Sequence, residues 1–450
     1  MYDEFYDVKC TADGGFIAVG ETWSFGAGDV DWYVVKTDSM GHLQWSRTFG
    51  GIYDDRARAV TVTAEGDFVV AGWISGDTSR YEDFALIKIG ADGDSIWGRT
   101  YGGQSSDLAS DVLQTEDGGF VIAGQTHSFG AGGYDAWLLK TDADGDSVWS
   151  HTYGGRGWDA AYSIAPTADG GFALAGETGS FGAGAYDMWL VRTDSIGDSL
   201  WSRTYGGGSF DEARSMALAS DGGFMLAGYT GSFGQGWENA WFVKTDSSGN
   251  MEWNRTFGNG LQVYALDIVR LPDGGYIAGG FYSNDVGNTP FWLLRINSNG
   301  DSLWGRIWGD THADGINALE RTSDGGYVLA GLIGWRMDRT SGDAVMMRTA
   351  PDPAVAEEHP YSPVKDYSIA MFPNPFNSVC TIAFALPTTQ QISLKVYDLL
   401  GREVSVLQQG WAEAGTHNVR FDAGNLPSGI YFYRLIAGSQ SLSRKMVLLK

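Results

Sequence analysis

An aspartate recurs at one position of a long repeat, and its carboxylate is the first feature that could bind a ligand or take part in chemistry. It can accept backbone N–H bonds from a neighbouring loop. Several together can ligate a cation such as Ca²⁺, which takes many oxygen ligands. They can also accept hydrogen bonds from sugar hydroxyls, with aromatic rings stacked nearby. We favour the first role, because the acid recurs in almost every repeat. Val263 breaks the series, whose members are Asp3, Asp55, Asp107, Asp159, Asp211 and Asp314.

Aromatic side chains accompany these acids. A Ser-Phe-Gly tripeptide recurs in the loops that we place on the same face, and loops carry function more often than strands do. Trp158, Trp237 and Trp335 would add exposed rings. If the face binds a ligand, we expect the contacts to come from Asp55, Asp107, Asp159, Asp211, Asp314, Phe129, Phe181 and Phe233.

No catalytic constellation stands out. There is no G-x-S-x-G elbow, no Cys/His pairing and no metal-ligand spacing, and the two cysteines, Cys10 and Cys380, lie far apart. We therefore expect a binding or scaffold module for a glycan or protein, without a cofactor. A carbohydrate-active or otherwise hydrolytic protein that uses loop-face carboxylates is the alternative. Calcium is a weaker expectation, because the acidic turn at 142–146 keeps its glycine but loses its acids in the equivalent turn at 246–250.

Internal repeats predict the architecture that must position these residues. The turn Asp13-Gly14-Gly15 returns six times, at intervals of 52 residues and finally 51, and the later copies begin at Glu65, Asp117, Asp169, Asp221, Asp273 and Asp324. The unit at 159–208 contains four apolar segments, 159–164, 172–176, 187–192 and 200–204, each bounded by Gly or Asp turns. Seven such units predict an all-β, seven-bladed propeller over residues 1–350.

One tryptophan stands in the fourth strand of six units: Trp45, Trp97, Trp149, Trp201, Trp253 and Trp304. A large flat ring at a fixed place can wedge between neighbouring blades, so we interpret these residues as structural. The segment 37–45 resembles the tryptophan-docking motif of quinoprotein-like propellers, with one residue fewer between Asp38 and Gly41. The resemblance implies the fold and no cofactor.

The seventh unit has only three predicted strands, 316–322, 327–331 and 344–348, and then enters a linker. Met1 aligns with a position one strand into the repeat. We expect a preceding strand of the Trp-x-Arg-Thr type to close the ring, and a signal peptide before it.

The C-terminal region differs from the repeats. A linker is expected at 351–370, followed by 371–450 with the motifs PNPFN at 373–377, VYDLLGREV at 396–404 and LPSGIYFY at 426–433. These motifs resemble the type A sorting domain of the type IX secretion system. The resemblance implies handling by that machinery, export across the outer membrane, and a body that is anchored or released. The residues that carry it are Pro373, Asn374, Pro375, Asn377, Gly401, Gly429, Lys445 and Lys450.

Alternating residues in this tail, at 392–397, 419–421 and 430–435 with turns at Gly401 and Gly429, predict a small Ig-like β-sandwich. An ordinary Ig-like adhesion module is the alternative.

The formal charge of the chain is −25, and all of it falls within residues 1–350. An acidic body disfavours nucleic acid and anionic lipid as partners. No apolar stretch is long enough to span a bilayer. We expect a secreted or cell-surface monomer.

Overall fold

The computed structural model describes residues 2–76, 81–234, 237–258, 262–283, 289–308, 313–335, 342–349, 367–372, 376–386, 388, 390–412, 415–438 and 440–449. Every element in these ranges is a β-strand.

The first 27 strands form seven sheets, which we call blades 1 to 7. Blades 1 and 2 contain β1 (Asp3–Cys10), β2 (Phe16–Thr22), β3 (Asp31–Thr37), β4 (Leu43–Phe49), β5 (Arg56–Val62), β6 (Phe68–Ser75), β7 (Glu82–Ile89) and β8 (Ser95–Tyr101). Blades 3 and 4 contain β9 (Asp107–Gln114), β10 (Phe120–Thr126), β11 (Asp135–Thr141), β12 (Ser147–Tyr153), β13 (Asp159–Pro166), β14 (Phe172–Thr178), β15 (Asp187–Thr193) and β16 (Ser199–Tyr205). Blades 5 to 7 contain β17 (Asp211–Leu218), β18 (Phe224–Thr230), β19 (Asn239–Thr245), β20 (Met251–Phe257), β21 (Gln262–Arg270), β22 (Tyr276–Ser283), β23 (Phe291–Ile296), β24 (Ser302–Trp308), β25 (Ala313–Arg321), β26 (Tyr327–Trp335) and β27 (Asp343–Arg348).

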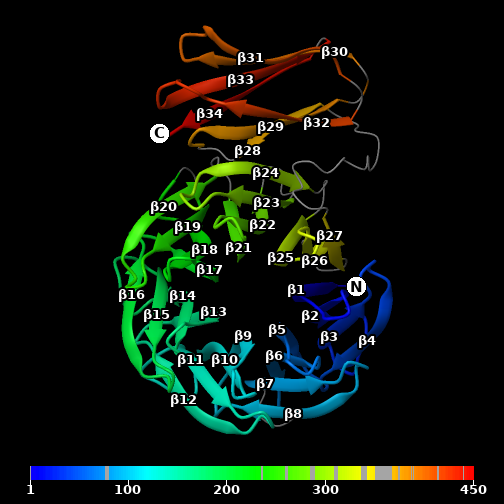
Figure 1. The fold of residues 1–450 in the computed structure, drawn as a ribbon, viewed down its shortest axis with the longest axis vertical. Helices are drawn as coiled ribbons and strands as arrows, with labels where there is room; N and C mark the ends of the chain where they lie inside the picture. The colour runs from blue at the N-terminus through cyan, green and yellow to red at the C-terminus, as the bar shows by residue number, and fades with distance from the viewer. Residues whose placement is uncertain are drawn as a thin grey trace.

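The blades close into a ring. Each is an antiparallel sheet in chain order, and its first strand is the innermost, as Figure 1 shows for β1, β5, β9, β13, β17, β21 and β25. Neighbouring innermost strands contact one another around the whole ring, and β1 contacts β25 and β26 to complete it. The predicted seven-bladed propeller is confirmed, and the loops at one rim of the channel become neighbours.

The repeated tryptophans pack between blades, as expected. A Cβ added at Gly197 would lie 2.8 Å from the ring of Trp149, and the glycine has φ +87°, so both space and backbone favour Gly there. The same tryptophan–glycine contact recurs at four other blade junctions: Trp45–Gly93, Trp97–Gly145, Trp201–Gly249 and Trp253–Gly300. Buried residues of adjacent blades join in shared cores on either side of each junction.

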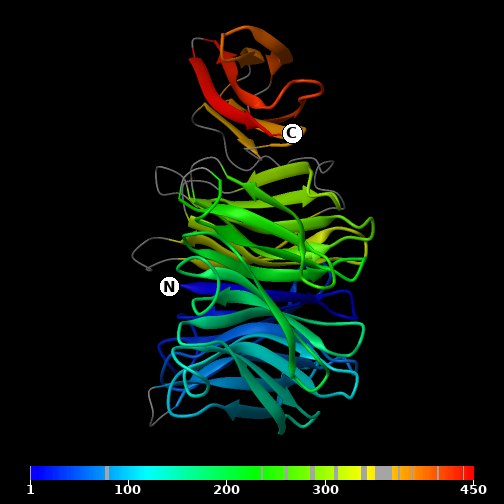
Figure 2. The same ribbon diagram turned by 90° about the vertical axis from the view of Figure 1, so that its left-hand side faces the viewer.

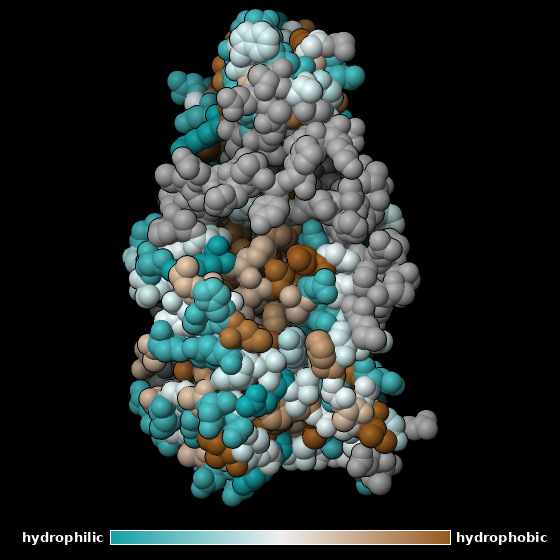
Figure 3. Space-filling model, turned by 90° about the vertical axis from the view of Figure 1, so that its right-hand side faces the viewer, coloured by the Kyte–Doolittle hydropathy of each residue, from teal (hydrophilic) through white to brown (hydrophobic). Residues whose placement is uncertain are grey.

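Blade 7 has three strands among the described residues, so the outer edge of β27 is open. The side chains of β27 are all at least partly exposed, whereas those of β11, β15 and β19 are fully buried. Figure 3 looks onto this side of the ring and shows apolar side chains in a hollow beneath the grey residues. Gly41 is the blade 1 counterpart of the glycines that hold tryptophans, and no described atom lies within 4 Å of its Cβ position. Among the residues that the structure describes, no tryptophan occupies this position beside Gly41.

The last seven strands form a sandwich of two sheets, β28-β29-β32 and β31-β30-β33-β34, around one shared apolar core. The strands are β28 (Ser368–Phe372), β29 (Val379–Leu386), β30 (Gln390–Asp398), β31 (Glu403–Ala412), β32 (Gly415–Asp422), β33 (Gly429–Ala437) and β34 (Gln440–Leu448). Gly401 has φ +75° in a turn, as predicted. The expected turn at Gly429 is wrong, because this residue pairs with Leu448 and begins β33.

The sandwich lies against the rim of blade 6, where β29 contacts β24 (Figure 2). Its first strand begins at Ser368, within the range expected for the linker. None of the described segments is a helix that could cross a bilayer.

Candidate functional site at the channel mouth

A β-bulge interrupts every innermost strand. In β5 the pairing with β6 steps from Ala57 to Ala59, so Arg58 is an extra residue without a partner opposite it. The same step occurs in all seven blades. Bulges aim a side chain differently from a regular strand and often lie beside functional sites. The seven extra residues, which we call the bulge ring, are Tyr6, Arg58, Ser110, Tyr162, Arg214, Leu266 and Asn317.

The bulge ring lies near the start of the innermost strands, toward the face that carries the loops between second and third strands. Its members are half-buried, while the residues flanking them in β5 and β17 are buried. They also contact one another between blades, since Arg58 lies over Tyr6 and Arg214 lies over Tyr162. This position differs between blades, and so does the position two residues earlier, which holds Glu4, Arg56, Leu108, Ala160, Glu212, Tyr264 and Gly315. Sequence reasoning missed the ring, and the available signal was this variability within the innermost strands.

One cluster of the ring spans blades 4 and 5. The Arg214 guanidinium lies 4.6 Å from the Tyr162 ring, and its Nε lies 2.5 Å from Glu212 Oε1. The Tyr162 hydroxyl donates to Glu177 at 2.7 Å, and Tyr229 donates to Glu212. Burial first, and the Glu212 charge second, raise the pKa of Glu177 to about 7. Both Glu212 oxygens are engaged, so Glu177 is the carboxylate of this pair that is less committed to protein contacts.

A second cluster spans blades 7, 1 and 2. Glu4 accepts hydrogen bonds from Tyr2, from Tyr6 at 2.9 Å and from Asn317 at 2.7 Å. Burial raises the pKa of the Tyr6 hydroxyl well above its usual value. Arg58 completes this cluster, with its guanidinium 3.9 Å from the centroid of the Tyr6 ring.

The neighbouring Glu21 side chain is also occupied. It accepts a hydrogen bond from Trp23 Nε1 at 3.3 Å and pairs with Arg56 Nε at 3.3 Å. Arg58 and Arg214 thus each lie over a tyrosine of the preceding blade, but they differ in their contacts with carboxylates, since Arg214 pairs with Glu212.

The predicted aspartates lie at the beginning of the innermost strands and are buried. Asp159 accepts hydrogen bonds from Gly155 N at 2.8 Å, from Ser180 Oγ at 2.5 Å and from the Thr178 hydroxyl. Asp107 and Asp211 repeat this set of contacts. These contacts are those of a structural carboxylate that accepts hydrogen bonds from neighbouring loops, and they join the loop after one blade to the next blade. A ligand role for these residues stays a prediction.

The two remaining members of the predicted set also accept backbone N–H groups. Asp55 accepts N–H groups of Gly51 at 2.5 Å and Ser75 at 2.7 Å, and Asp314 accepts that of Gly334 at 2.8 Å. Burial raises the pKa of Asp55. No group of three or more metal-ligating side chains is present among the residues that the structure describes.

The predicted phenylalanines are exposed in the loops between second and third strands. Phe129, Phe181 and Phe233 have exposed fractions of 44%, 47% and 43%, and each lies beside a third-strand tryptophan of its own blade. Trp158 and Trp237 are exposed too, and the Trp335 side chain lies outside the described residues. The structure therefore places exposed apolar rings on the loop face of blades 3 to 5.

The acidic turn considered for calcium is a hydrogen-bonded hairpin turn. Asp142 Oδ1 accepts the N–H groups of Asp144 at 3.0 Å and Asp146 at 2.8 Å, and Gly145 has φ +81°. Asp246 makes the same contacts in its own blade, where the other acids are absent. The glycine turn thus explains the repeated part of the motif.

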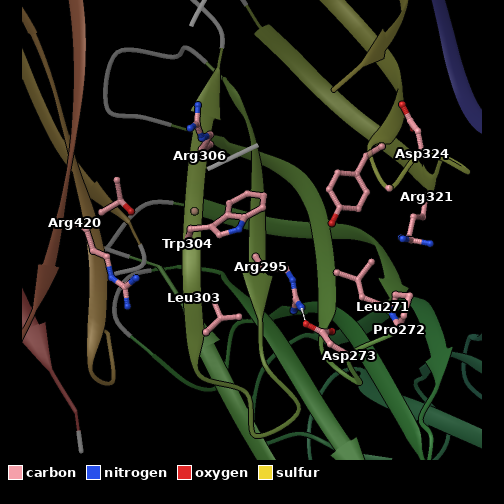
Figure 4. A pocket seen from close by; sticks show the side chains of 14 residues that line it. Leu271, Pro272, Asp273, Arg295, Leu303, Trp304, Arg306, Arg321, Asp324 and Arg420 are labelled. Atoms are coloured by element: carbon pink, nitrogen blue, oxygen red, sulfur yellow. Dashed lines mark hydrogen bonds and ion pairs between the residues drawn. The ribbon is translucent and has the colours of Figure 1, made fainter. Parts of the chain in front are cut away.

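One cavity lies away from the channel, between blades 6 and 7 and the sandwich. It has a volume of about 970 Å³. Figure 4 shows Arg295 pointing toward Asp273, with Trp304 above them and Arg420 of the sandwich on the opposite wall. Its position beside the incomplete blade 7 makes it a gap between units.

Those expected sorting residues that the structure describes lie in or beside the sandwich. Asn377 donates from Nδ2 to Asp301 of blade 6 at 2.9 Å, and Lys445 lies on β34 opposite Phe432. Pro373, Asn374, Pro375 and Lys450 lie outside the described residues.

Comparisons with known proteins bear mainly on the C-terminal part. Residues 370–449 match the model of the secretion system C-terminal sorting domain. The regulatory protein FlaEY of Caulobacter vibrioides is 27% identical over 161 residues, which cover 31% of this chain and 17% of that protein.

Two solved structures are similar in fold. PorZ, an essential bacterial surface component of the type IX secretion system of Porphyromonas gingivalis, aligns with 99% of this chain at 12% identity and a TM-score of 0.44, and 59% of PorZ is covered. The WD40 domain of Neurospora crassa Pan2 aligns with 72% of this chain at 8% identity and a TM-score of 0.46, and 85% of that domain is covered.

The motifs, the two-sheet sandwich and the family match agree, and the body before them is the propeller. Residues 370–449 therefore belong to the type IX secretion system C-terminal sorting domain family, carried here behind a seven-bladed β-propeller.

Proposed function

We propose that this protein is an exported binding module that holds a glycan at the mouth of the propeller channel. The sorting domain supports export to the cell surface or beyond. The observation that carries the binding proposal is the bulge ring, where blades of similar sequence present different side chains. A binding site for an asymmetric ligand must break the symmetry of its scaffold, and the bulge ring does so.

The chemistry of the mouth favours sugars. Tyr, Arg, Ser and Asn side chains of the bulge ring, together with the Glu side chains that contact them, provide donors and acceptors, and hydroxyl groups use both. Trp158 and the exposed phenylalanines of the same face offer flat apolar surfaces of the kind that enclose a ligand with few polar groups. The acidic body favours neutral ligands over strongly anionic polymers. A protein ligand is the other outcome of the test.

The test uses the full chain against a panel of oligosaccharides and measures both binding and the unfolding midpoint, which a ligand of the folded state must raise. Ser110 is the small member of the bulge ring, so Ser110→Trp should fill the mouth and weaken binding at least tenfold. Ser202→Trp, at the exposed outer strand of blade 4, is the matched control and should bind as the parent does. Binding to no oligosaccharide, or equal binding by both variants, would overturn the proposal.

Hydrolysis is a second candidate because one observation favours it. Glu177, with a pKa of about 7, can hold a proton near neutral pH, as a general acid must. Release of reducing sugar from any bound oligosaccharide, lost in Glu177→Gln while binding persists, would support this activity. Intact oligosaccharide after long incubation would leave the protein a binding module.

A further inference from the structure

Arg58 faces the channel with no counter-charge of its own. Its guanidinium lies between two rings, 3.9 Å from the centroid of Tyr6 and 4.6 Å from that of Trp73. It makes no hydrogen bond or ion pair with any residue that the structure describes. Its counterpart in the other cluster, Arg214, pairs with Glu212. One arginine of the mouth therefore has its donors uncommitted.

The nearby carboxylates make no direct ion pair with Arg58 among the described residues, and each contacts other groups instead. Glu4 accepts from two tyrosines and Asn317, and Glu21 accepts from Trp23 and pairs with Arg56. The rings of Tyr6 and Trp73 restrict the guanidinium plane, which lowers the entropy that ordering it on a ligand would cost. The N–H donors of the Arg58 guanidinium are thus oriented before a ligand binds.

We infer that Arg58 binds a carboxylate of the ligand, so that the glycan contains uronic acid residues. This inference rests on the proposed function and names the sugar class. A guanidinium presents parallel N–H donors that match the two oxygens of a carboxylate. A single planar monoanion suits this place better than a doubly charged phosphate, because Glu4 and Glu21 lie in the same cluster and would repel the larger charge.

The experiment compares an otherwise neutral oligosaccharide that carries one galacturonic acid residue with its methyl ester, which has the same length and shape but no charge. The full chain should bind the acid at least tenfold more tightly than the ester. Arg58→Gln should abolish this preference by weakening the acid alone, and Arg58→Lys should keep part of it because the charge remains without the fork. Arg99→Gln removes an arginine that lies over Trp97 on the outer rim, and it should change neither ligand.

The outcomes separate the two proposals. Equal binding of acid and ester by the parent, or a preference that persists in Arg58→Gln, overturns the role of Arg58 and leaves glycan binding intact. If the protein binds neither the acid nor the ester, and also binds no neutral oligosaccharide of the panel, both glycan binding and the role of Arg58 are overturned. If Arg99→Gln loses the preference for the acid as fully as Arg58→Gln does, the preference comes from the overall charge of the protein, and the role of Arg58 is again overturned.

Discussion

Replacing Asp159 by alanine should destabilise the propeller by about 3–5 kcal/mol. The buried carboxylate accepts the Gly155 N–H, the Ser180 hydroxyl and the Thr178 hydroxyl, and Thr178 is fully buried. An orphaned buried donor costs about 1–3 kcal/mol, and three of them, partly relieved as the hydroxyls rotate, give this range. Part of this loss is offset at the neighbouring Asp135. Burial raises the pKa of Asp135 and the Asp159 charge raises it further, so removing Asp159 relieves a repulsion between two carboxylates.

The assay is denaturant unfolding of the full chain, monitored by tryptophan fluorescence, with the slope of the transition compared among variants. Asp198→Ala is the matched control. Its side chain is 66% exposed, and its removal should change stability by no more than about 0.5 kcal/mol. A loss below about 1 kcal/mol in Asp159→Ala would refute the structural role and return the aspartate series to the candidate ligand contacts.

Four further outcomes are expected. Trp149→Ala should cost about 2 kcal/mol in the same assay because it empties a half-buried seat between blades, whereas Trp237→Ala, at a ring 81% exposed, should cost almost nothing. Raising the pH from 4.5 through about 7 should lower the free energy of unfolding of the parent by at most about 3 kcal/mol, because the folded state holds the Glu177 proton more tightly than the unfolded state does. A pH series of unfolding midpoints should show this decrease in the parent and lack it in Glu177→Gln. A peptide with the sequence of β16 should pair with β27, place its tryptophan at Gly41 and raise the thermal midpoint, while its Trp-to-Ala version should not. Removing 371–450 should leave the body inside the outer membrane in a cell with type IX secretion, as fractionation would show.

The sequence by itself determined the architecture, because each part of it has a local cause. Glycine turns at a 52-residue interval, four apolar segments per unit and one tryptophan per outer strand are visible without any contact between distant residues. The three strands of blade 7 that the structure describes were visible in the same way. The sorting domain was recognised from short motifs in order, and its two sheets follow from alternation along single strands.

The site depended on tertiary structure. A regular strand alternates its faces, so Arg58 cannot be assigned to the channel until the bulge between Ala57 and Ala59 is known. Its contact with Tyr6 joins residues one full repeat apart and exists only because the ring brings two innermost strands together. Burial of Asp159 was hidden for a similar reason, since its partners come from loops on both sides of it. Local pattern sets the strands, but packing of one blade on the next decides which side chains face the channel.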